Sequence, residues 1–600
     1  MLMSTHEARL HSLREELKRR ELDGFVIPIS DEHMSEYVGE YAQRLAWLTG
    51  FGGSAGTAVV TQDKAVMFVD GRYTLQVRDQ VDGKFWDYES IPETSPAKWL
   101  GENAGEGAKI GFDPWVHSRG WAKAAAKELE KRGASLVAVD TNPVDSVWED
   151  QPAPSAAFAR PHDEKLAGRS SADKRAAIAD WLTKNRYDAA VITALDSIAW
   201  LFNIRGSDVS RTPVALSFAI VHADGTAELF VAPEKVSPAL SAHLGNAVTI
   251  RDRDAFETAL EKMDGQVVTV DPDRSVAAIF RALEEAGATI KEERDPVVLP
   301  KAIKTEAEQQ GHRAAQARDG AAIAKFLQWV QREAPTGRVS ELEASDRLEA
   351  FRAESDMLTD LSFDTISGAG PNGAVVHYRV SEETNRTLEP NSVYLVDSGG
   401  QYADGTTDIT RTVWIGPDAA PAVVKDRFTR VLKGHIALAM AVFPKGTVGS
   451  QLDTLARQYL WQAGLDYAHG TGHGVGSYLS VHEGPQNIGK GGRPNEQELL
   501  PGMILSNEPG YYKTGEYGIR IENLVLVEPR TVDGAEQQVM GFETLTFAPI
   551  DRALIDTALL TQAEREWLDT YHAKVLEVVG PGLAGDQRGW LEAQCAPLPA

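Results

Sequence analysis

Residues 393–400 read Val-Tyr-Leu-Val-Asp-Ser-Gly-Gly, and residues 406–414 read Thr-Thr-Asp-Ile-Thr-Arg-Thr-Val-Trp. Both are apolar or β-branched runs typical of buried strands, and the first ends in a glycine turn. The short connection between them predicts an antiparallel pair that places Asp397 and Asp408 side by side. Either aspartate alone is typical of a turn or a cap, but two carboxylates in apolar strands need a charge partner or a metal ion.

A second pair of apolar runs carries two glutamates. Residues 503–510 read Met-Ile-Leu-Ser-Asn-Glu-Pro-Gly, and residues 518–527 read Gly-Ile-Arg-Ile-Glu-Asn-Leu-Val-Leu-Val. Each run predicts a strand, and a connection rich in glycine and tyrosine joins them. Glu508 and Glu522 therefore repeat the arrangement of the aspartates, with one acid in each strand.

A stretch rich in glycine and histidine lies between the two pairs. Residues 469–476 read His-Gly-Thr-Gly-His-Gly-Val-Gly, and residues 481–485 read Val-His-Glu-Gly-Pro. The glycines let the backbone approach closely, which suits a loop that presents imidazoles; a purely structural glycine turn is the alternative. Four carboxylates and one imidazole favour Mn²⁺, Zn²⁺ or Co²⁺ over softer metals, and two divalent ions balance the four negative charges. These residues predict metal-assisted hydrolysis.

In this order and in these motifs, five residues resemble the ligands of the dinuclear metallopeptidases with the pita-bread fold. That family holds methionine aminopeptidases, prolidases and Xaa-Pro aminopeptidases. The five residues are Asp397, Asp408, His473, Glu508 and Glu522. The two histidine motifs look like the Xaa-Pro aminopeptidase version, and the resemblance covers essentially the whole chain, including Phe-Glu-Thr-Leu-Thr-Phe-Ala-Pro at 542–549.

The resemblance implies a role for each ligand. Asp397 is expected to bind one metal ion, and Asp408 and Glu522 to lie between both ions. His473 and Glu508 are expected to complete the shell of the other ion. Glu508 is also expected to accept the proton of the attacking water. The resemblance implies two divalent ions, Mn²⁺ first, with Zn²⁺ or Co²⁺ as alternatives.

The resemblance also implies roles for residues that do not bind metal. His377 and His482 match histidines that line the substrate site and stabilise the tetrahedral intermediate. His469 matches another active-site histidine. Arg520 matches an arginine that orients the ligand Glu522.

The first half of the chain contains two segments that look like versions of one another. Residues 22–27 read Leu-Asp-Gly-Phe-Val-Ile and residues 187–192 read Tyr-Asp-Ala-Ala-Val-Ile. Leu-Ala-Trp-Leu at 45–48 is likewise matched by Ile-Ala-Trp-Leu at 198–201. Each copy starts with an amphipathic helix and continues into short β-rich runs, a pattern typical of α/β domains. Duplication explains this pattern, and chance similarity between two α/β domains is the alternative.

Two proline-containing stretches indicate domain boundaries. Residues 151–157 are rich in proline and alanine, and the prolines of 295–300 precede a long helix expected from about residue 304 to 332. With the resemblance, these boundaries predict an α/β and α+β multi-domain chain. Two related creatinase-like α/β domains precede a pita-bread catalytic domain and a C-terminal extension packed on it. The expected limits are 1–155, 156–300, 301–530 and 531–600.

The composition limits the classes of binding partner that we expect for this chain. The 600 residues hold 61 Lys+Arg and 87 Asp+Glu, a net charge of −26 that repels phosphate backbones, so we expect no nucleic acid or membrane partner. The only cysteine, Cys595, excludes an intrachain disulfide. The start of the chain does not resemble a signal peptide, and the densest apolar run, Ile436 to Phe443, is too short to span a bilayer. We expect a cytoplasmic protein, and the resemblance implies a homodimer.

The leading hypothesis is an aminopeptidase that releases the N-terminal residue from peptides with proline in second position. The proline ring makes this bond a tertiary amide and restricts the preceding residue, which defeats most general peptidases. A prolidase that cuts Xaa-Pro dipeptides is the nearest alternative, and the three-domain length favours the aminopeptidase. A pita-bread domain that has lost its metal and acts as a binding module is disfavoured, because all five ligands are present.

Overall fold

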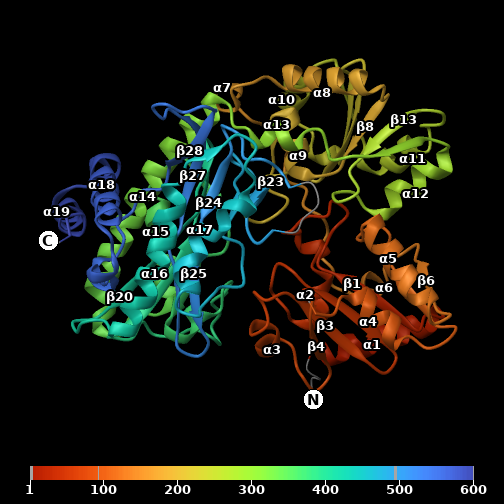
Figure 1. Ribbon diagram of the computed structural model, residues 1–600. Helices are drawn as coiled ribbons and strands as arrows, with labels where there is room; N and C mark the ends of the chain where they lie inside the picture. Colours follow the sequence, from red (N-terminus) through yellow and green to blue (C-terminus); the bar gives the residue numbers. More distant parts are fainter. Residues whose placement is uncertain (1–4, 92, 492–495, 599–600) are drawn as a thin grey trace. The chain divides into compact units, whose positions relative to one another are not determined.

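The structure is a computed structural model that describes residues 5–91, 93–491 and 496–598. The chain divides into two compact units (Figure 1). The N-terminal unit spans residues 1–164 and 169–298, and the C-terminal unit spans 165–168 and 299–600. Among the described residues, no helix combines the length and the apolar character that crossing a bilayer requires.

The N-terminal unit contains two six-stranded sheets with the same topology. Their strand orders are β4-β3-β2-β1-β5-β6 and β12-β11-β10-β8-β13-β14. In each, the third and fourth strands of this order pair antiparallel, and the fourth and fifth pair parallel. The strands are β1 Gly24–Pro28, β2 Thr57–Thr61, β3 Ala65–Val69, β4 Asp87–Ser90, β5 Lys109–Phe112, β6 Ser135–Ala138, β8 Ala189–Ile192, β10 Ser217–His222, β11 Ala227–Val231, β12 Val248–Arg251, β13 Val267–Val270 and β14 Thr289–Glu292. The prediction of two related α/β domains is confirmed.

Helices cover these sheets. Each copy starts with an amphipathic helix as predicted, α1 Thr5–Arg19 and α8 Ser171–Asn185, whose buried faces carry leucine or isoleucine. The other helices of the unit are α2 Arg44–Thr49, α3 Gln76–Gln80, α4 Pro96–Asn103, α5 Arg119–Glu130, α6 Pro143–Val147, α9 Leu195–Phe202, α10 Pro238–Leu244, α11 Phe256–Leu260 and α12 Ala277–Ala286. Residues 151–157, the predicted linker, form neither helix nor strand.

A long helix, α14 Glu306–Glu333, leads into the body of the C-terminal unit. Thr305 caps its first turn, and the side chain of Glu308 returns to the backbone of Thr305, which completes a capping box. The helix buries the apolar residues that the sequence places on one face: Ile323, Phe326, Leu327 and Val330. α13 Val298–Ala302 precedes it, and α7 Glu164–Ala167 lies at the division between the units.

The aspartate-bearing runs form the predicted antiparallel pair. β17 Ser392–Ser398 pairs with β20 Ile409–Ile415, and Asp397 lies opposite Thr410. The connection is more than a turn, because it forms two short strands that pair with each other, and the first of them also pairs with β15 in a separate sheet. The strands added here are β15 Leu358–Leu361, β16 Ile366–Ala369, which pairs with β17, β18 Gly400–Tyr402 and β19 Gly405–Thr406.

The glutamate-bearing runs lie in a six-stranded sheet of order β21-β28-β27-β24-β22-β23. A single strand over 518–527 was expected, and this is wrong: β26 Tyr517–Arg520 ends before Glu522 and pairs with β25 Gly510–Lys513 in a separate hairpin. β24 Ile504–Asn507 and β27 Asn523–Arg530 pair antiparallel, with Asn507 opposite Asn523. Both glutamates therefore lie one residue beyond the same end of this ladder. The remaining strands are β21 Phe443–Pro444, β22 Gly472–Gly474, β23 Glu483–Ile488 and β28 Val539–Thr544.

Helices complete the C-terminal unit. They are α15 Glu341–Arg352, α16 Ala422–Ala439, α17 Gly449–Trp461, α18 Gln562–Val579 and α19 Gly585–Gln594. α16 packs along α17, and the C-terminal helices α18 and α19 pack on α14 (Figure 1). The residues after 530 also contribute β28 to the six-stranded sheet, where it pairs with β27.

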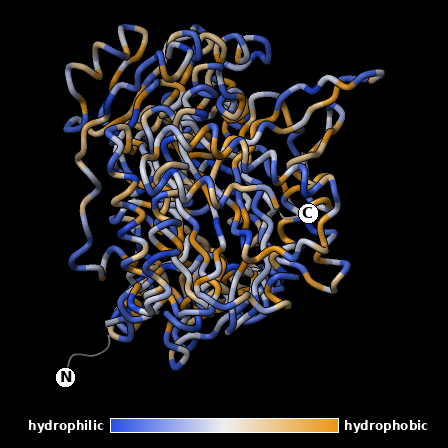
Figure 2. Tube along the Cα trace, turned by 90° about the vertical axis from the view of Figure 1, so that its left-hand side faces the viewer, coloured by the Kyte–Doolittle hydropathy of each residue, from blue (hydrophilic) through white to orange (hydrophobic). Residues whose placement is uncertain are grey.

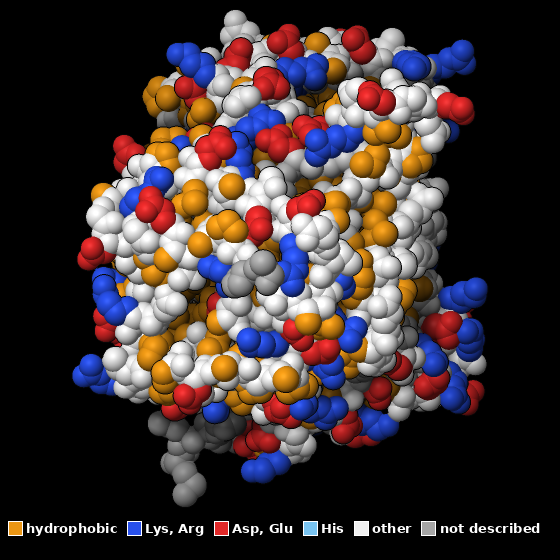
Figure 3. Space-filling view, turned by 60° about the vertical axis from the view of Figure 1, so that its left-hand side comes forward, with side chains coloured by type: hydrophobic (Ala, Val, Ile, Leu, Met, Phe, Trp, Pro, Cys, Tyr) orange, Lys and Arg blue, Asp and Glu red, His pale blue; other side chains and the backbone are white. Residues whose placement is uncertain are grey.

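The distribution of polar residues agrees with these elements. Apolar and polar residues alternate over short distances along the chain rather than gathering in long stretches (Figure 2). This is typical of amphipathic helices and of strands with one buried face. On the face that Figure 3 shows, acidic and basic side chains are interspersed.

Candidate metal centre and active site

Four carboxylates lie close together at the ends of strands from two sheets. Asp397 lies near the end of β17, and Asp408 immediately precedes β20. Glu508 follows β24 and Glu522 precedes β27. The amide of Glu522 donates to the carbonyl of Thr410 at 3.2 Å, and this hydrogen bond joins the two sheets at the site.

His473 on β22 faces these carboxylates. Its Nε2 lies 3.5 Å from Oδ2 of Asp408 and 3.6 Å from Oε1 of Glu508. Asp408, His473 and Glu522 each offer a ligand atom, and these atoms all lie within 4.8 Å of one another. Nδ1 of His473 donates to the carbonyl of Gly474 at 2.8 Å, which directs Nε2 towards the acids.

A glycine brings this histidine close to the neighbouring strand. A Cβ atom at Gly472 would lie 2.0 Å from the carbonyl oxygen of Ser506, so only glycine fits here. The hydroxyl of Ser506 in turn accepts from the amide of His473 at 2.9 Å and donates to Glu508 at 3.2 Å. One of the glycines in the His-Gly-Thr-Gly-His motif thus serves the close approach that the sequence predicts.

Arg520 organises the acidic side of the site. Its NH2 donates to Oδ2 of Asp397 at 2.6 Å, and its Nε donates to the hydroxyl of Thr410 at 3.1 Å. Thr410 donates to Oε2 of Glu522 at 2.6 Å. The expectation was that Arg520 orients Glu522; its direct carboxylate partner is instead Asp397, and it reaches Glu522 through Thr410.

The electrostatics show negative charge crowded into a buried space. Burial raises the pKa of Asp397, and the guanidinium of Arg520 offsets this only in part. Burial and then Asp408 raise the pKa of Glu522 well above its ordinary value, and burial raises that of Glu508 to about 7. Burial lowers the pKa of His473, but Asp408 and Glu508 more than reverse this and bring it to about 9. Additional positive charge is needed for all these acids to ionise together.

The residues present fit divalent cations. Oδ1 of Asp397 and Oδ1 of Asp408 are buried and make no hydrogen bond among the residues that the structure describes. Buried carboxylate oxygens without hydrogen bonds are costly unless a cation binds them. Oxygen donors with one imidazole are also the donor set of the metals expected from the sequence.

The two histidines expected to contact substrate lie on separate segments. The ring of His482 stands at 78° to that of His473, with the ring centroids 4.4 Å apart. His377 is half-buried and precedes Tyr378, whose hydroxyl donates to Glu341 at 2.9 Å. The structure therefore places His482 against the ligand residue His473 and anchors the segment of His377 through its neighbour.

His469 joins the site through a residue that the sequence analysis missed. Its Nε2 lies 2.8 Å from the hydroxyl of Tyr512, and this hydroxyl accepts from NH1 of Arg520 at 2.6 Å. Burial raises the pKa of Tyr512 above its ordinary range. Tyr512 lies in the tyrosine-rich connection noted in the sequence, but nothing in its spacing pointed to a role.

A second feature missed from the sequence is a buried cluster of charges next to His482. Glu483 pairs with Lys301 at 2.6 Å and with Lys304 at a shorter distance, and all three side chains are at most 1% exposed. Glu483 also lies opposite Gly474 in the β22–β23 pair. Lys301 directly follows the predicted domain boundary at 295–300, and Lys304 lies at the start of the predicted long helix, so neither position suggested a buried charge.

Comparison with known proteins gives the family. The family model for metallopeptidase family M24 matches residues 310–529, and that for its C-terminal region matches 538–598. Two models for creatinase/prolidase N-terminal domains match residues 9–146 and 150–308. A protein of Aspergillus fumigatus, described as a probable Xaa-Pro aminopeptidase P, is 40% identical over 98% of this chain and 92% of its own length. The chain belongs to metallopeptidase family M24.

Solved structures extend the likeness to the whole of this M24 chain. The X-prolyl aminopeptidase of Caenorhabditis elegans, described as a cytosolic enzyme with a di-nuclear active site, is 35% identical. It matches with a TM-score of 0.94 over 99% of this chain and 100% of its own. A dipeptidase of Mycobacterium ulcerans is 26% identical, with a TM-score of 0.51, and covers only 65% of this chain. The expected fold, two creatinase-like domains followed by a pita-bread domain, is confirmed.

Proposed function

We propose that this chain is an Xaa-Pro aminopeptidase, which releases the N-terminal residue from peptides whose second residue is proline. The observation that carries this is the convergence of four carboxylates and His473 in a chain that resembles an X-prolyl aminopeptidase over its whole length. The chain is a metallopeptidase, and its reaction is hydrolysis of a peptide bond.

We propose that the site holds two divalent cations, Mn²⁺ first and Zn²⁺ or Co²⁺ as alternatives. Asp397 would hold one ion, His473 and Glu508 the other, and Asp408 and Glu522 both. Four carboxylates balance the four positive charges of two such ions. When bound, the ions supply Lewis acidity towards the scissile carbonyl and lower the pKa of a water molecule.

Glu508 is proposed to carry the proton. The proline nitrogen has no hydrogen in the peptide, so it must gain a proton to leave as a secondary amine. Glu508 takes a proton from the attacking water and returns it to this nitrogen as the carbon–nitrogen bond breaks. Its backbone amide donates to the carbonyl of Thr471 at 2.8 Å, which fixes the position from which the carboxylate acts.

Histidines and an arginine are proposed to complete the site. His482 and His377 donate to the oxygen of the scissile carbonyl, where negative charge develops. His469 and Arg520, joined through Tyr512, hold Asp397 in place. Of these residues, His482 and His377 act on the substrate and the other two act on the ligands.

The acidic site suits a substrate with a free N-terminus. Carboxylates attract the α-ammonium group, and acetylation removes that charge. A pocket shaped for the proline ring, which lacks an amide hydrogen, rejects other residues at the second position.

The prolidase alternative is less well supported. The Mycobacterium ulcerans dipeptidase covers only 65% of this chain, whereas the C. elegans X-prolyl aminopeptidase covers 99% of it. A binding module without catalysis is disfavoured, because such modules lack ligands and all five are present in this chain.

Further properties follow from the resemblance and are part of the proposal. We propose a cytoplasmic homodimer whose partners are peptides and neither nucleic acid nor membrane, in keeping with the net charge of −26. We also keep the domain limits of 1–155, 156–300, 301–530 and 531–600 as a proposal.

Four peptides at one Mn²⁺ concentration test the substrate class: Arg-Pro-Pro, N-acetyl-Arg-Pro-Pro, Arg-Ala-Pro and the dipeptide Arg-Pro. Cleavage of the first alone supports the proposal. Cleavage of Arg-Pro alone indicates a prolidase, and equal cleavage of Arg-Ala-Pro contradicts the specificity for proline.

A further inference from the structure

One buried arginine holds the loop that carries His469. Arg457 lies on α17 and is 0% exposed, and Asp453 lies one turn earlier on the same helix. We propose that Arg457 and Asp453 are positioning residues. They fix the backbone of residues 466–471, and through it the positions of His469 and of Glu508, whose amide hydrogen-bonds to this loop. This inference rests on the proposed function for its meaning, and on the contacts below for its evidence.

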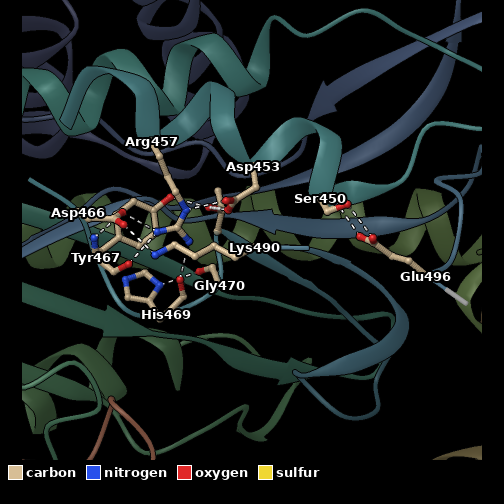
Figure 4. Close-up of polar contacts among 10 residues, drawn as sticks. Ser450, Asp453, Arg457, Asp466, Tyr467, His469, Gly470, Lys490 and Glu496 are labelled. Atoms are coloured by element: carbon tan, nitrogen blue, oxygen red, sulfur yellow. Dashed lines mark hydrogen bonds and ion pairs between the residues drawn. The ribbon is translucent and has the colours of Figure 1, made fainter. Parts of the chain in front are cut away.

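The guanidinium of Arg457 donates to four acceptors at once. Its Nε donates to Oδ2 of Asp453 at 2.6 Å, and its NH1 donates to Oδ1 of Asp466 at 2.9 Å and to the carbonyl of Tyr467 at 2.7 Å. Its NH2 donates to the carbonyl of His469 at 2.8 Å. Figure 4 shows Arg457 and Asp453 reaching from one helix towards the loop of Tyr467 and His469. The arginine therefore fixes the backbone of this loop at two points.

Asp453 extends the same restraint to the next part of the loop. It accepts a short hydrogen bond from the hydroxyl of Thr471, which also lies 2.5 Å from the hydroxyl of Tyr467. The carbonyl of Thr471 accepts from the amide of Glu508 at 2.8 Å. A displacement of Thr471 would therefore move the backbone of the proposed proton carrier.

The other end of the loop leads to a proposed metal ligand. From His469 the hydrogen bonds continue to Tyr512 at 2.8 Å, then to Arg520 at 2.6 Å and to Asp397 at 2.6 Å. Arg457 thus stands at the start of two paths, one to Glu508 and one to Asp397. Residues that orient metal ligands in this way typically change metal affinity or activity ~10 to 100-fold when they are replaced.

The geometry requires an arginine. A lysine carries the same charge but only three donors on one nitrogen, whereas the planar guanidinium presents five in a fixed fork. The guanidinium also stacks on Tyr467, with its carbon 3.8 Å from the ring centroid. Arg457→Lys therefore keeps the buried positive charge but cannot make all four hydrogen bonds at once.

The test compares Arg457→Lys with Thr471→Val, a milder variant that removes the contacts of the Thr471 hydroxyl with Asp453 and Tyr467 and leaves the hydrogen bonds of Arg457 in place. Arg44→Lys is the matched control, because Arg44 is largely buried and grips Asp145 with two hydrogen bonds of 2.6 and 2.8 Å within the N-terminal unit. Each protein is loaded with Co²⁺, and its visible absorption spectrum, bound metal, kcat and KM for Arg-Pro-Pro are measured below its melting temperature.

We expect Arg457→Lys to shift the Co²⁺ spectrum and to lower kcat by ~10 to 100-fold with KM changed by less than about 2-fold. Thr471→Val should change the Co²⁺ spectrum and kcat in the same direction but by a smaller amount. Arg44→Lys should change neither. A spectrum and kcat in Arg457→Lys and Thr471→Val that match the wild type would overturn the inference. If the wild type cleaves none of the peptides but the spectra still shift, the positioning role stands and the proposed function fails.

Discussion

The buried charge cluster around Glu483 gives a sharp test of how the C-terminal unit is held together. Glu483→Gln keeps the shape of the side chain but removes the counter-charge of Lys301 and Lys304, whose side chains are 1% exposed. Removing one partner of a buried ion pair costs about 3 to 5 kcal/mol, because the remaining charge stays buried. At ~2 to 4 °C per kcal/mol, the melting temperature of the unit should fall by about 10 °C.

Variants of the lysines separate the effect of the lost charge on stability from the effect of lost packing. Lys304→Met leaves Glu483 paired with Lys301 at 2.6 Å, so we expect a smaller loss of stability. In the double variant Lys304→Met/Glu483→Gln, one buried lysine rather than two has lost the carboxylate of Glu483. It should therefore be more stable than Glu483→Gln alone by more than about 1 kcal/mol.

Differential scanning calorimetry measures each transition. Glu15→Gln is the control, since it breaks a pair with Lys18 in which both side chains are more than half exposed, and such surface pairs contribute little to stability. A Glu483→Gln melting temperature within about 2 °C of the wild type would show that Glu483 does not compensate the buried lysines. So would a double variant that melts below Glu483→Gln.

Three further predictions concern ligands, substrate groups and pH. Asp408→Ala should lose bound metal and activity together in elemental analysis and peptide assays, and full turnover by a metal-free variant would exclude the ligand role. His482→Ala and His377→Ala should keep their metal but lose turnover by ~10² to 10³-fold, and a metal-free variant of either would move that residue to the coordination shell. Burial lowers the pKa of His117 from 6.5 to about 4, so its contribution to stability is present above pH 6.5 and is lost as pH falls towards 4. His117→Gln should therefore reduce the fall in the free energy of unfolding over this range by up to about 3 kcal/mol, and an unchanged pH dependence in calorimetry would show that His117 is not buried and neutral.

Much of the fold and of the candidate site could be predicted because local patterns specify them. The apolar runs around Asp397 and Glu508 predicted strands, and the repeated helix and strand segments predicted two related domains. The break between β26 and β27 was not predictable, because residues 518–527 read as one strand while the two halves of this run pair with strands of different sheets.

The residues that support the site were harder to predict, because their partners lie far away in the chain. Lys301 and Glu483 are 182 positions apart, and Arg520 and Asp397 are 123 apart. A buried lysine or arginine looks like any surface cation until the fold supplies its carboxylate. Arg457 and Asp453 are close in sequence, but their spacing of four on a helix is equally typical of an exposed pair.

We propose that four carboxylates and His473 bind two metal ions and make this M24 chain an Xaa-Pro aminopeptidase. Titration of metal-stripped protein with Mn²⁺ tests it most directly, with arginine released from Arg-Pro-Pro and bound metal measured at each step. The release of arginine should be absent without metal, should rise as Mn²⁺ binds and should level off at two bound ions per chain. Full release of arginine by the metal-free protein, or no release at any metal load, would contradict this proposal.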